Sequence, residues 1–254
     1  MSQPPSRQKA SGPSSPNTVG EDIQADNGRW HFGEDVPQHF SSHVRRSVPY
    51  YDDGHRLAVK LSDYFVQPDS QCCEIGCSTG TLLGKLAQHH PHSVSWLGID
   101  KEPAMIEQAH KELQLKAPQH QNMTLVDGDA LLMDLPTSDL MVAYYTIQFV
   151  PPRQRQELIN KIYESLNWGG GFIFFEKIRG ADARFQDMLT GLYNDYKLDQ
   201  GYSGDEIIAK SRALKGVLEP FSEQGNIDLL KRAGFVDIMC VFRYLNFAGF
   251  VCIK

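Results

Sequence analysis

One short segment constrains the fold more than any other, the run Glu-Ile-Gly-Cys-Ser-Thr-Gly at residues 74–80. It lies between a short apolar run and an amphipathic stretch, which predicts a strand that turns through small residues directly into a helix. Small residues let backbone N–H groups approach a ligand closely, and the positive end of the helix dipole points into the same crevice. The segment therefore predicts an α/β fold that binds a nucleotide-like cofactor at this turn.

A second apolar strand at 97–100 ends in Asp100, whose carboxylate is placed to accept hydrogen bonds from ribose hydroxyls. The dinucleotide fingerprint requires glycine at positions 76, 78 and 81, but the chain has Ser78 and Thr81 at two of them. The spacing therefore favours a nucleotide-like cofactor other than NAD.

Further strands follow with short connections. The strand at 123–126 leads into Asp129, an acid placed to accept from an adenine amino group. The strand at 139–145 is almost continuously apolar, as expected of a central parallel strand buried on both faces. A helix from 151 to about 166 opens on two prolines and ends in the glycine run 169–171, and a strand at 172–176 follows. This alternation predicts a doubly wound parallel sheet.

The C-terminal stretches 235–243 and 249–254 predict two strands joined as a hairpin, which gives the sheet an antiparallel edge. We therefore expect an α/β, Rossmann-like, doubly wound sheet of seven strands, mostly parallel, with a C-terminal antiparallel hairpin. Residues 1–28 have the composition of a disordered tail. Residues 29–254 are expected to form one domain, with a helical N-terminal cap at about 29–64 and a helical insertion at about 179–221.

Composition excludes several classes of function. The net charge is −6 and adjacent basic residues occur only as two separate pairs, Arg45-Arg46 and Lys231-Arg232, which argues against direct nucleic-acid binding. No apolar run reaches the roughly 18 residues of a membrane span. The five cysteines are an odd number without metal-ligand spacing, so we expect reduced structural thiols, no metal site and a cytoplasmic location, with a metal or redox role as the alternative.

The turn and the strand-end acids resemble the class I S-adenosylmethionine-dependent methyltransferases, whose motif I is Asp/Glu-x-Gly-x-Gly-x-Gly, with Ser78 in place of the middle glycine. The alternative is a plain strand-to-helix turn with surface acids. The resemblance implies that S-adenosylmethionine is the cofactor. The implied cofactor-binding residues are Tyr51, Glu74, Gly76, Cys77, Ser78, Gly80, Asp100, Lys101, Asp129, Ala130 and Tyr144.

A narrower resemblance rests on longer phrases, among them Ser-Val-Pro-Tyr-Tyr at 47–51, Thr-Ile-Gln-Phe at 146–149 and Gly-Tyr-Ser at 201–203. Over roughly residues 30–254 the chain is similar to the carboxy-S-adenosylmethionine synthase family, formerly described as tRNA wobble-uridine methyltransferases. The resemblance implies a homodimer. It also implies conversion of the cofactor, with prephenate as carboxyl donor, into a carboxylated sulfonium that a second enzyme uses on tRNA.

Two departures affect that chemistry. The family has a Lys-Arg pair whose Arg binds the carboxylate of the carboxylated cofactor, whereas this chain has Lys210-Ser211-Arg212, with Ser211 at the Arg position. A hydroxyl cannot reproduce the bidentate contact of a guanidinium. Tyr144 stands where the family has Asn. The candidate catalytic residues are therefore Tyr51, Tyr144 and Arg212, and His39 and His43 are weaker candidates for a base.

Three functions remain open from the sequence. The first is methyl transfer from S-adenosylmethionine to a small-molecule acceptor, in which the protein contributes mainly orientation and removal of water. The second is carboxy-S-adenosylmethionine synthesis, and the third is a cofactor-binding module without catalysis.

Overall fold

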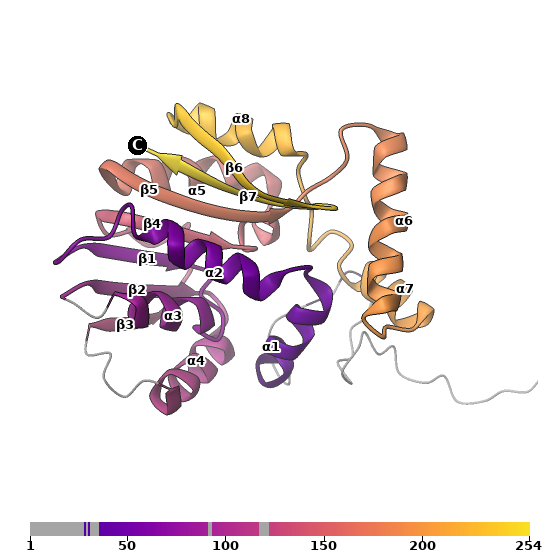
Figure 1. Cartoon of the computed structure of the whole chain (residues 1–254), viewed down its shortest axis with the longest axis horizontal. Helices are drawn as coiled ribbons and strands as arrows, with labels where there is room; N and C mark the ends of the chain where they lie inside the picture. The colour runs from indigo at the N-terminus through magenta and orange to yellow at the C-terminus, as the bar shows by residue number, and fades with distance from the viewer. Residues whose placement is uncertain (1–27, 29, 31–35, 91–92, 117–121) are drawn as a thin grey trace, which may run out of the picture.

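The computed structural model describes residues 28, 30, 36–90, 93–116 and 122–254 (Figure 1). The expected tail at 1–28 lies, apart from Gly28, outside the described residues. The strands are β1 (Gln71–Ile75), β2 (Ser95–Asp100), β3 (Met123–Asp127), β4 (Ser138–Tyr144), β5 (Leu166–Lys177), β6 (Asp237–Tyr244) and β7 (Phe247–Ile253). The helices are α1 (Val36–Ser47), α2 (Tyr51–Ser62), α3 (Thr81–His89), α4 (Pro103–Lys116), α5 (Pro152–Ser165), α6 (Ala183–Asp199), α7 (Gly204–Ala213) and α8 (Glu223–Ala233), with a 3₁₀ turn η1 (Ile147–Phe149).

The strands form one seven-stranded sheet in the order β3-β2-β1-β4-β5-β7-β6. The first five strands pair in parallel, and β7 pairs antiparallel with both β5 and β6. The chain order reverses between β1 and β4, and in such sheets ligands bind at this switch point beyond the carboxyl ends of the strands. The predicted Rossmann-like fold with its C-terminal hairpin is confirmed.

Helices cover both faces of the sheet (Figure 1). On one face, Ala58 of α2 and Leu82 and Leu86 of α3 belong to a core cluster with β1 and β4 side chains. On the other face, side chains of α5 and α8 pack on β4, β5 and β7. The central strand β4 is buried along nearly its whole length, as its apolar sequence predicts.

The prediction for the start of β5 is wrong. The glycine run 169–171, expected to end a helix, lies within the strand, which already begins at Leu166. The pairing of β4 with β5 shifts register between Ser138 and Leu140, and Gly169 adopts a positive φ of 79°. The glycines therefore serve an irregular strand start, because Gly tolerates the backbone that a bulge requires.

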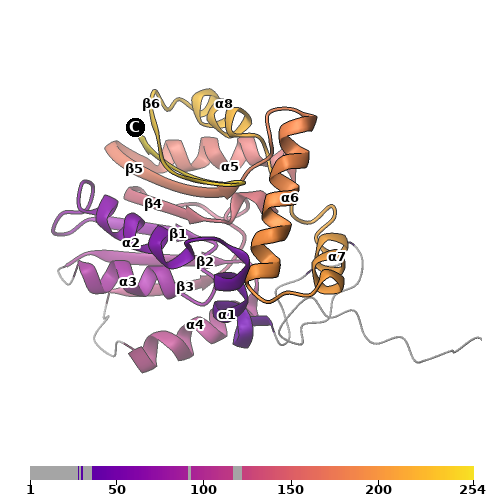
Figure 2. The same cartoon turned by 45° about the vertical axis from the view of Figure 1, so that its right-hand side comes forward.

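Three helices lie beyond the carboxyl ends of the parallel strands. Figure 2 shows α1, α6 and α7 gathered at this end of the sheet, where they come from the expected N-terminal cap and the expected insertion. The cap and the insertion are therefore helical, as predicted. None of the helices in the described residues combines the length and the apolar character that a bilayer span requires.

Candidate active site

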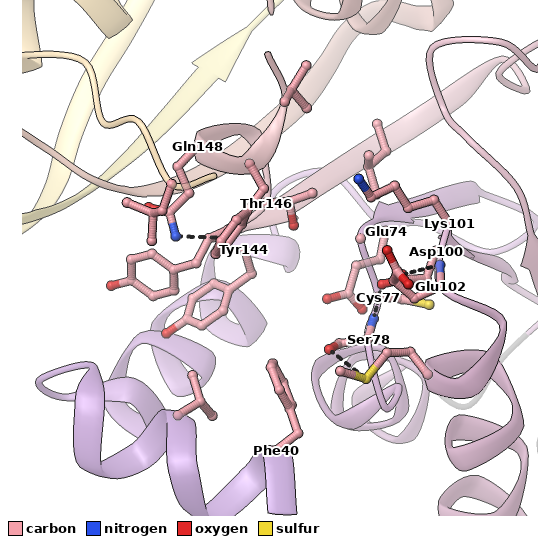
Figure 3. Close-up of a pocket in the computed structure, with 18 of the residues that line it drawn as sticks. Phe40, Glu74, Cys77, Ser78, Asp100, Lys101, Glu102, Tyr144, Thr146 and Gln148 are labelled. Carbon is pink, nitrogen blue, oxygen red and sulfur yellow. Dashed lines mark hydrogen bonds between the residues drawn. The ribbon is translucent and has the colours of Figure 1, made fainter. Parts of the chain in front are cut away.

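A cavity of ≈ 370 Å³ lies between the carboxyl ends of the parallel strands and the three covering helices. Its floor comes from the segments that follow β1, β2, β3 and β4, and α1, α6 and α7 contribute residues to its far wall. Figure 3 shows Glu74, Cys77, Ser78 and Asp100 on one side of it and Tyr144, Thr146 and Gln148 on the other. A single cavity thus joins a polar end at the turn after β1 to an aromatic end at β4.

The turn after β1 is held in one shape by backbone hydrogen bonds to β2. Gly76 N and Cys77 N both donate to the carbonyl oxygen of Ile99, at 2.7 and 3.0 Å. Gly76 has φ 71°, and a Cβ there would lie 2.3 Å from Cγ2 of Thr146, so only glycine fits. Ser78, which replaces the family's middle glycine, also has a positive φ of 54°. The departure at Ser78 therefore keeps the glycine-like backbone of the motif.

Glu74 offers a vacant acceptor to a ligand. Its side chain is buried in the cavity floor, and the oxygen Oε2 has no hydrogen-bond partner in the described residues. Burial raises the pKa of this carboxyl well above its ordinary value. An uncompensated buried carboxyl oxygen is costly, and an ammonium group of a bound ligand would satisfy it. This observation fits the amino acid end of S-adenosylmethionine.

Asp100 is fixed by two backbone N–H groups. Its Oδ2 accepts from Ser78 N at 2.8 Å and its Oδ1 accepts from Glu102 N at 3.0 Å (Figure 3). Burial raises its pKa, and the hydrogen bonds from the same two N–H groups oppose that shift. Each carboxylate oxygen keeps a further lone pair, so the group can still accept from the hydroxyls of a ribose.

The other predicted cofactor residues are placed as follows. Asp129 Oδ1 accepts from Leu131 N at 2.9 Å, and both Asp129 and the buried Ala130 line the cavity. Lys101 also lines it, with an exposed side chain. Gly80 does not line the cavity but forms the N-cap of α3 with φ 70°. The structure thus brings ten of the eleven predicted residues to one cavity.

The cavity thiol is inert. Cys77 lines the cavity and is buried, and burial raises its pKa well above the ordinary value. Its Sγ would lie only 3.0 Å from a Cβ on Gly98, so the thiol fills space over the neighbouring strand. A thiol that stays protonated packs as a small hydrophobe and is a poor nucleophile.

Tyr51 and Tyr144 form the aromatic end. Their rings meet edge to face with centroids 5.3 Å apart, and the Tyr144 hydroxyl donates to the backbone oxygen of Tyr51 at 2.7 Å. The ring of His55 lies 4.4 Å from Tyr51 and 4.6 Å from Tyr144. Burial raises the pKa of both phenols, so they are neutral rings at ordinary pH. Such ring faces attract a sulfonium and exclude water from it.

Arg212 is exposed on α7 and does not line the cavity, and Ser211 beside it is exposed as well. The predicted role of Arg212 therefore has no support from its position within one chain. The residue of α7 that reaches the cavity is Lys210, whose Nζ donates to Ser47 Oγ at 2.5 Å and to His43 Nε2 at 2.6 Å. Lys210 follows the buried Ile207 by three residues and precedes the buried Ala213 by three, so it lies on the buried face of α7.

The histidines are unsuited to act as bases. His43 lines the cavity, but its Nε2 already accepts from Lys210, and burial, Lys210 and Arg46 lower its pKa to about 2. His55, which the sequence reasoning missed, has its pKa lowered to about 3 by burial and by Lys85. His39 is exposed and does not line the cavity.

Comparisons with known proteins agree with this geometry. Residues 73–170 match the methyltransferase domain family. The carboxy-S-adenosyl-L-methionine synthase of Nautilia profundicola is 36% identical over 89% of this chain and 95% of its own length, and that of Sulfurimonas denitrificans is 37% identical over the same shares. Human N-acetylserotonin methyltransferase, solved in complex with SAM, has a TM-score of 0.62 at 18% identity, covering 87% of this chain and 56% of its own.

The fold and the site define an S-adenosylmethionine-dependent transferase of the methyltransferase class, with S-adenosylmethionine as its cofactor or substrate. Within that class, the chain belongs to the carboxy-S-adenosyl-L-methionine synthase family.

Proposed function

We propose that this protein transfers a methyl group from S-adenosylmethionine to a small-molecule acceptor. The observation that carries this choice is the cation content of the cavity wall. Lys101, Lys177 and Lys210 line the cavity, and no arginine is found among the described residues that do so. A carboxylated sulfonium needs a partner for its extra carboxylate, and the planar, bidentate guanidinium suited to that contact is missing from the wall.

The protein's residues would bind, orient and dehydrate the reacting groups. Bound S-adenosylmethionine supplies a methyl group on a positively charged sulfur, a good leaving group that needs no acid from the protein. Glu74 and Asp100 would hold its two polar ends. Tyr51 and Tyr144 would enclose the reacting centre, where orientation and removal of water lower the barrier.

Two properties support a small acceptor. The helices α1, α6 and α7 lie beyond the carboxyl ends of the parallel strands (Figure 2), and the cavity that they help to line, of ≈ 370 Å³, holds a metabolite but not a duplex or a folded tRNA. The chain has a net charge of −6, whereas binding to a phosphate backbone depends on clustered cations. We further propose a cytoplasmic protein without direct contact to nucleic acid.

Methyl transfer is tested with purified protein, S-adenosylmethionine carrying an isotopically labelled methyl group, and a metabolite extract. We expect label in at least one small molecule with wild-type protein. Asp100→Ala is expected to lose it because S-adenosylmethionine binding, followed by calorimetry, weakens at least about 10-fold when a charged acceptor is removed. Asp127→Ala is the matched control, since Asp127 ends the adjacent strand β3, is exposed and does not line the cavity. Unlabelled metabolites in the wild-type reaction would contradict the proposal.

Carboxy-S-adenosylmethionine synthesis is the second candidate. Family membership favours it, and so does Lys210, a cation on α7 whose Nζ lies at the cavity wall one residue before the expected Arg position. Mass spectrometry of the ligand that co-purifies, with prephenate supplied, decides between the two functions. Detection of the carboxylated cofactor would establish the second, and only the unmodified or demethylated cofactor would eliminate it.

We also propose a homodimer that forms through α6. The family resemblance implies this state, and one face of α6 exposes Phe185, Met188 and Leu192, which are 55%, 62% and 52% accessible. Their spacing of three and four residues places them in one stripe along the helix. An apolar stripe of this kind suits contact with a second copy of the chain.

A further inference from the structure

A lysine that the sequence reasoning did not single out lies at the aromatic end of the cavity. Lys177 is the last residue of β5 and lines the cavity together with Tyr145, Tyr193 and Phe247. Its backbone N donates to Oε1 of Gln148 at 2.9 Å, which ties the end of β5 to the 3₁₀ turn after β4. The amine therefore stands on a rigid strand end, at the carboxyl edge of the sheet where this fold performs its chemistry.

The surroundings of the amine are aromatic and cationic. Nζ of Lys177 lies 4.3 Å from the centroid of the Tyr193 ring, and Nζ of Lys197 lies 4.6 Å from the same centroid. Two lysine amino groups thus share one ring. Among the described residues no carboxylate forms an ion pair with Lys177, so nothing acidic balances its charge there. Partial burial beside a like charge disfavours the protonated amine.

The groups that face Lys177 from the packed elements agree with this conclusion. Tyr193 and Lys197 face it from α6, and Tyr145 faces it from the residue after β4. Burial raises the pKa of both Tyr145 and Tyr193, so these two phenols stay neutral. Burial and then Lys197 lower the pKa of Lys177 to about 7. A large fraction of the amine is therefore neutral at ordinary pH.

Few other groups in this cavity could act as a base, since Glu74 is assigned to the amino acid end of the cofactor. The lone pair of His43 Nε2 is occupied by Lys210, and His55 is held as a weak base by its low pKa. Tyr51 and Tyr144 are phenols with raised pKa values, which require a stronger base to give up a proton. Lys177 combines access to the cavity, a free amine and a fixed position, which are the requirements for general-base catalysis.

We propose that Lys177 is the general base of this site and that the acceptor is a small phenol. This inference rests on the proposed methyl transfer. The phenolic proton moves to the neutral amine of Lys177, the phenolic oxygen forms a bond to the methyl carbon, and the carbon–sulfur bond breaks with its electron pair staying on sulfur. The planar rings of Tyr145, Tyr193 and Phe247 line the space that an aromatic acceptor would fill.

The first test measures the amine without any acceptor. The protein is labelled with acetic anhydride over a range of pH, and the modification of Lys177 is followed by peptide mass spectrometry against the exposed Lys231. We expect a midpoint near pH 7 for Lys177, compared with roughly 10.4 for an ordinary lysine. Lys197→Met should move the Lys177 midpoint upward, because it removes the repelling charge from α6. A Lys177 midpoint that matches the midpoint of Lys231 would overturn the proposal that Lys177 is the general base.

The second test measures methyl transfer from labelled S-adenosylmethionine to phenol, catechol and 4-hydroxybenzoate. Lys177→Met and Lys177→Arg are expected to lower kcat about 100-fold or more and to abolish the rise of rate with pH around 7. Binding of S-adenosylmethionine and the melting temperature of both variants serve as controls for folding. In Lys197→Met the acid limb should move to higher pH with an unchanged plateau.

The outcomes separate the two proposals. Transfer to metabolites of an extract but to no phenol would overturn the phenolic acceptor and leave the proposed methyl transfer standing. An unchanged kcat and pH profile in Lys177→Met would overturn the base alone. A wild-type enzyme that methylates nothing would overturn both proposals.

Discussion

At the residue scale, Gly54 and Tyr144 depend on each other. Tyr144 stands where the family resemblance expects Asn, and its hydroxyl crosses to the first turn of α2. A Cβ on Gly54 would lie 2.1 Å from that hydroxyl oxygen. The large side chain of Tyr144 on β4 therefore fits because Gly54 on α2 has no side chain. This contact couples the aromatic end of the cavity to the N-terminal cap.

We expect Gly54→Ala to destabilise the protein by about 1–3 kcal/mol, because the added methyl group would displace the Tyr144 hydroxyl from its hydrogen bond to the backbone oxygen of Tyr51. The double variant Gly54→Ala/Tyr144→Asn should recover most of this loss, since the shorter side chain removes the clash. Urea unfolding of the four proteins of the cycle measures the coupling. Additive effects in the double variant would show that the two positions do not interact.

Residue identities near the turn could be predicted because the motif fixes the backbone. Glu74, Asp100 and Asp129 lie at or just beyond the carboxyl ends of β1, β2 and β3, and parallel strands bring these ends to one edge of the sheet. The role expected of Arg212 could not be tested by spacing alone. Adjacent helix positions differ by about 100°, and α7 is too weakly amphipathic for its sequence to show that Lys210, and not Arg212, faces the cavity.

At the element scale, α6 illustrates what a periodic pattern leaves open. Its apolar stripe predicts a helix that covers something, and the structure places one part of the helix, at Tyr193 and Lys197, against the site while the stripe at 185–192 is exposed. The periodicity shows which face of the helix is apolar but not what that face contacts, because a lid, a core and a dimer contact all need the same spacing.

The exposed stripe of α6 leads to a prediction about assembly. We expect Met188→Asp to shift the protein from dimer to monomer, because a charge at the centre of an apolar contact is not compensated there. Light scattering coupled to size exclusion measures the mass. Leu132→Asp is the control, since Leu132 is an exposed apolar side chain outside α6. A wild-type monomer, or equal effects of the two substitutions, would rule out α6 as the contact.

At the scale of the whole molecule, stability in acid is a balance of buried groups with opposite signs. His43 and His55 have pKa values lowered to about 2 and about 3, so below about pH 6.5 the unfolded chain binds protons that the folded chain refuses. Their contribution to the stability of the folded chain is complete above pH 6.5 and is lost as the pH falls. Glu74 and Glu176 have raised pKa values, so above pH 4.5 the folded chain binds protons that the unfolded chain does not. The contribution of these two carboxyls to the stability of the folded chain therefore grows as the pH falls.

Two neutral substitutions separate these opposing contributions. Between pH 6 and pH 5, His55→Gln should gain stability relative to wild type by up to about 1.4 kcal/mol per pH unit, because the variant lacks the proton that only the unfolded chain accepts. Glu176→Gln should lose stability relative to wild type over the same range, since it lacks the proton that the folded chain takes up. Urea unfolding at several pH values gives both slopes, and each variant is the control for the other. Slopes of the same sign would contradict the assignment of at least one buried group as charged or neutral.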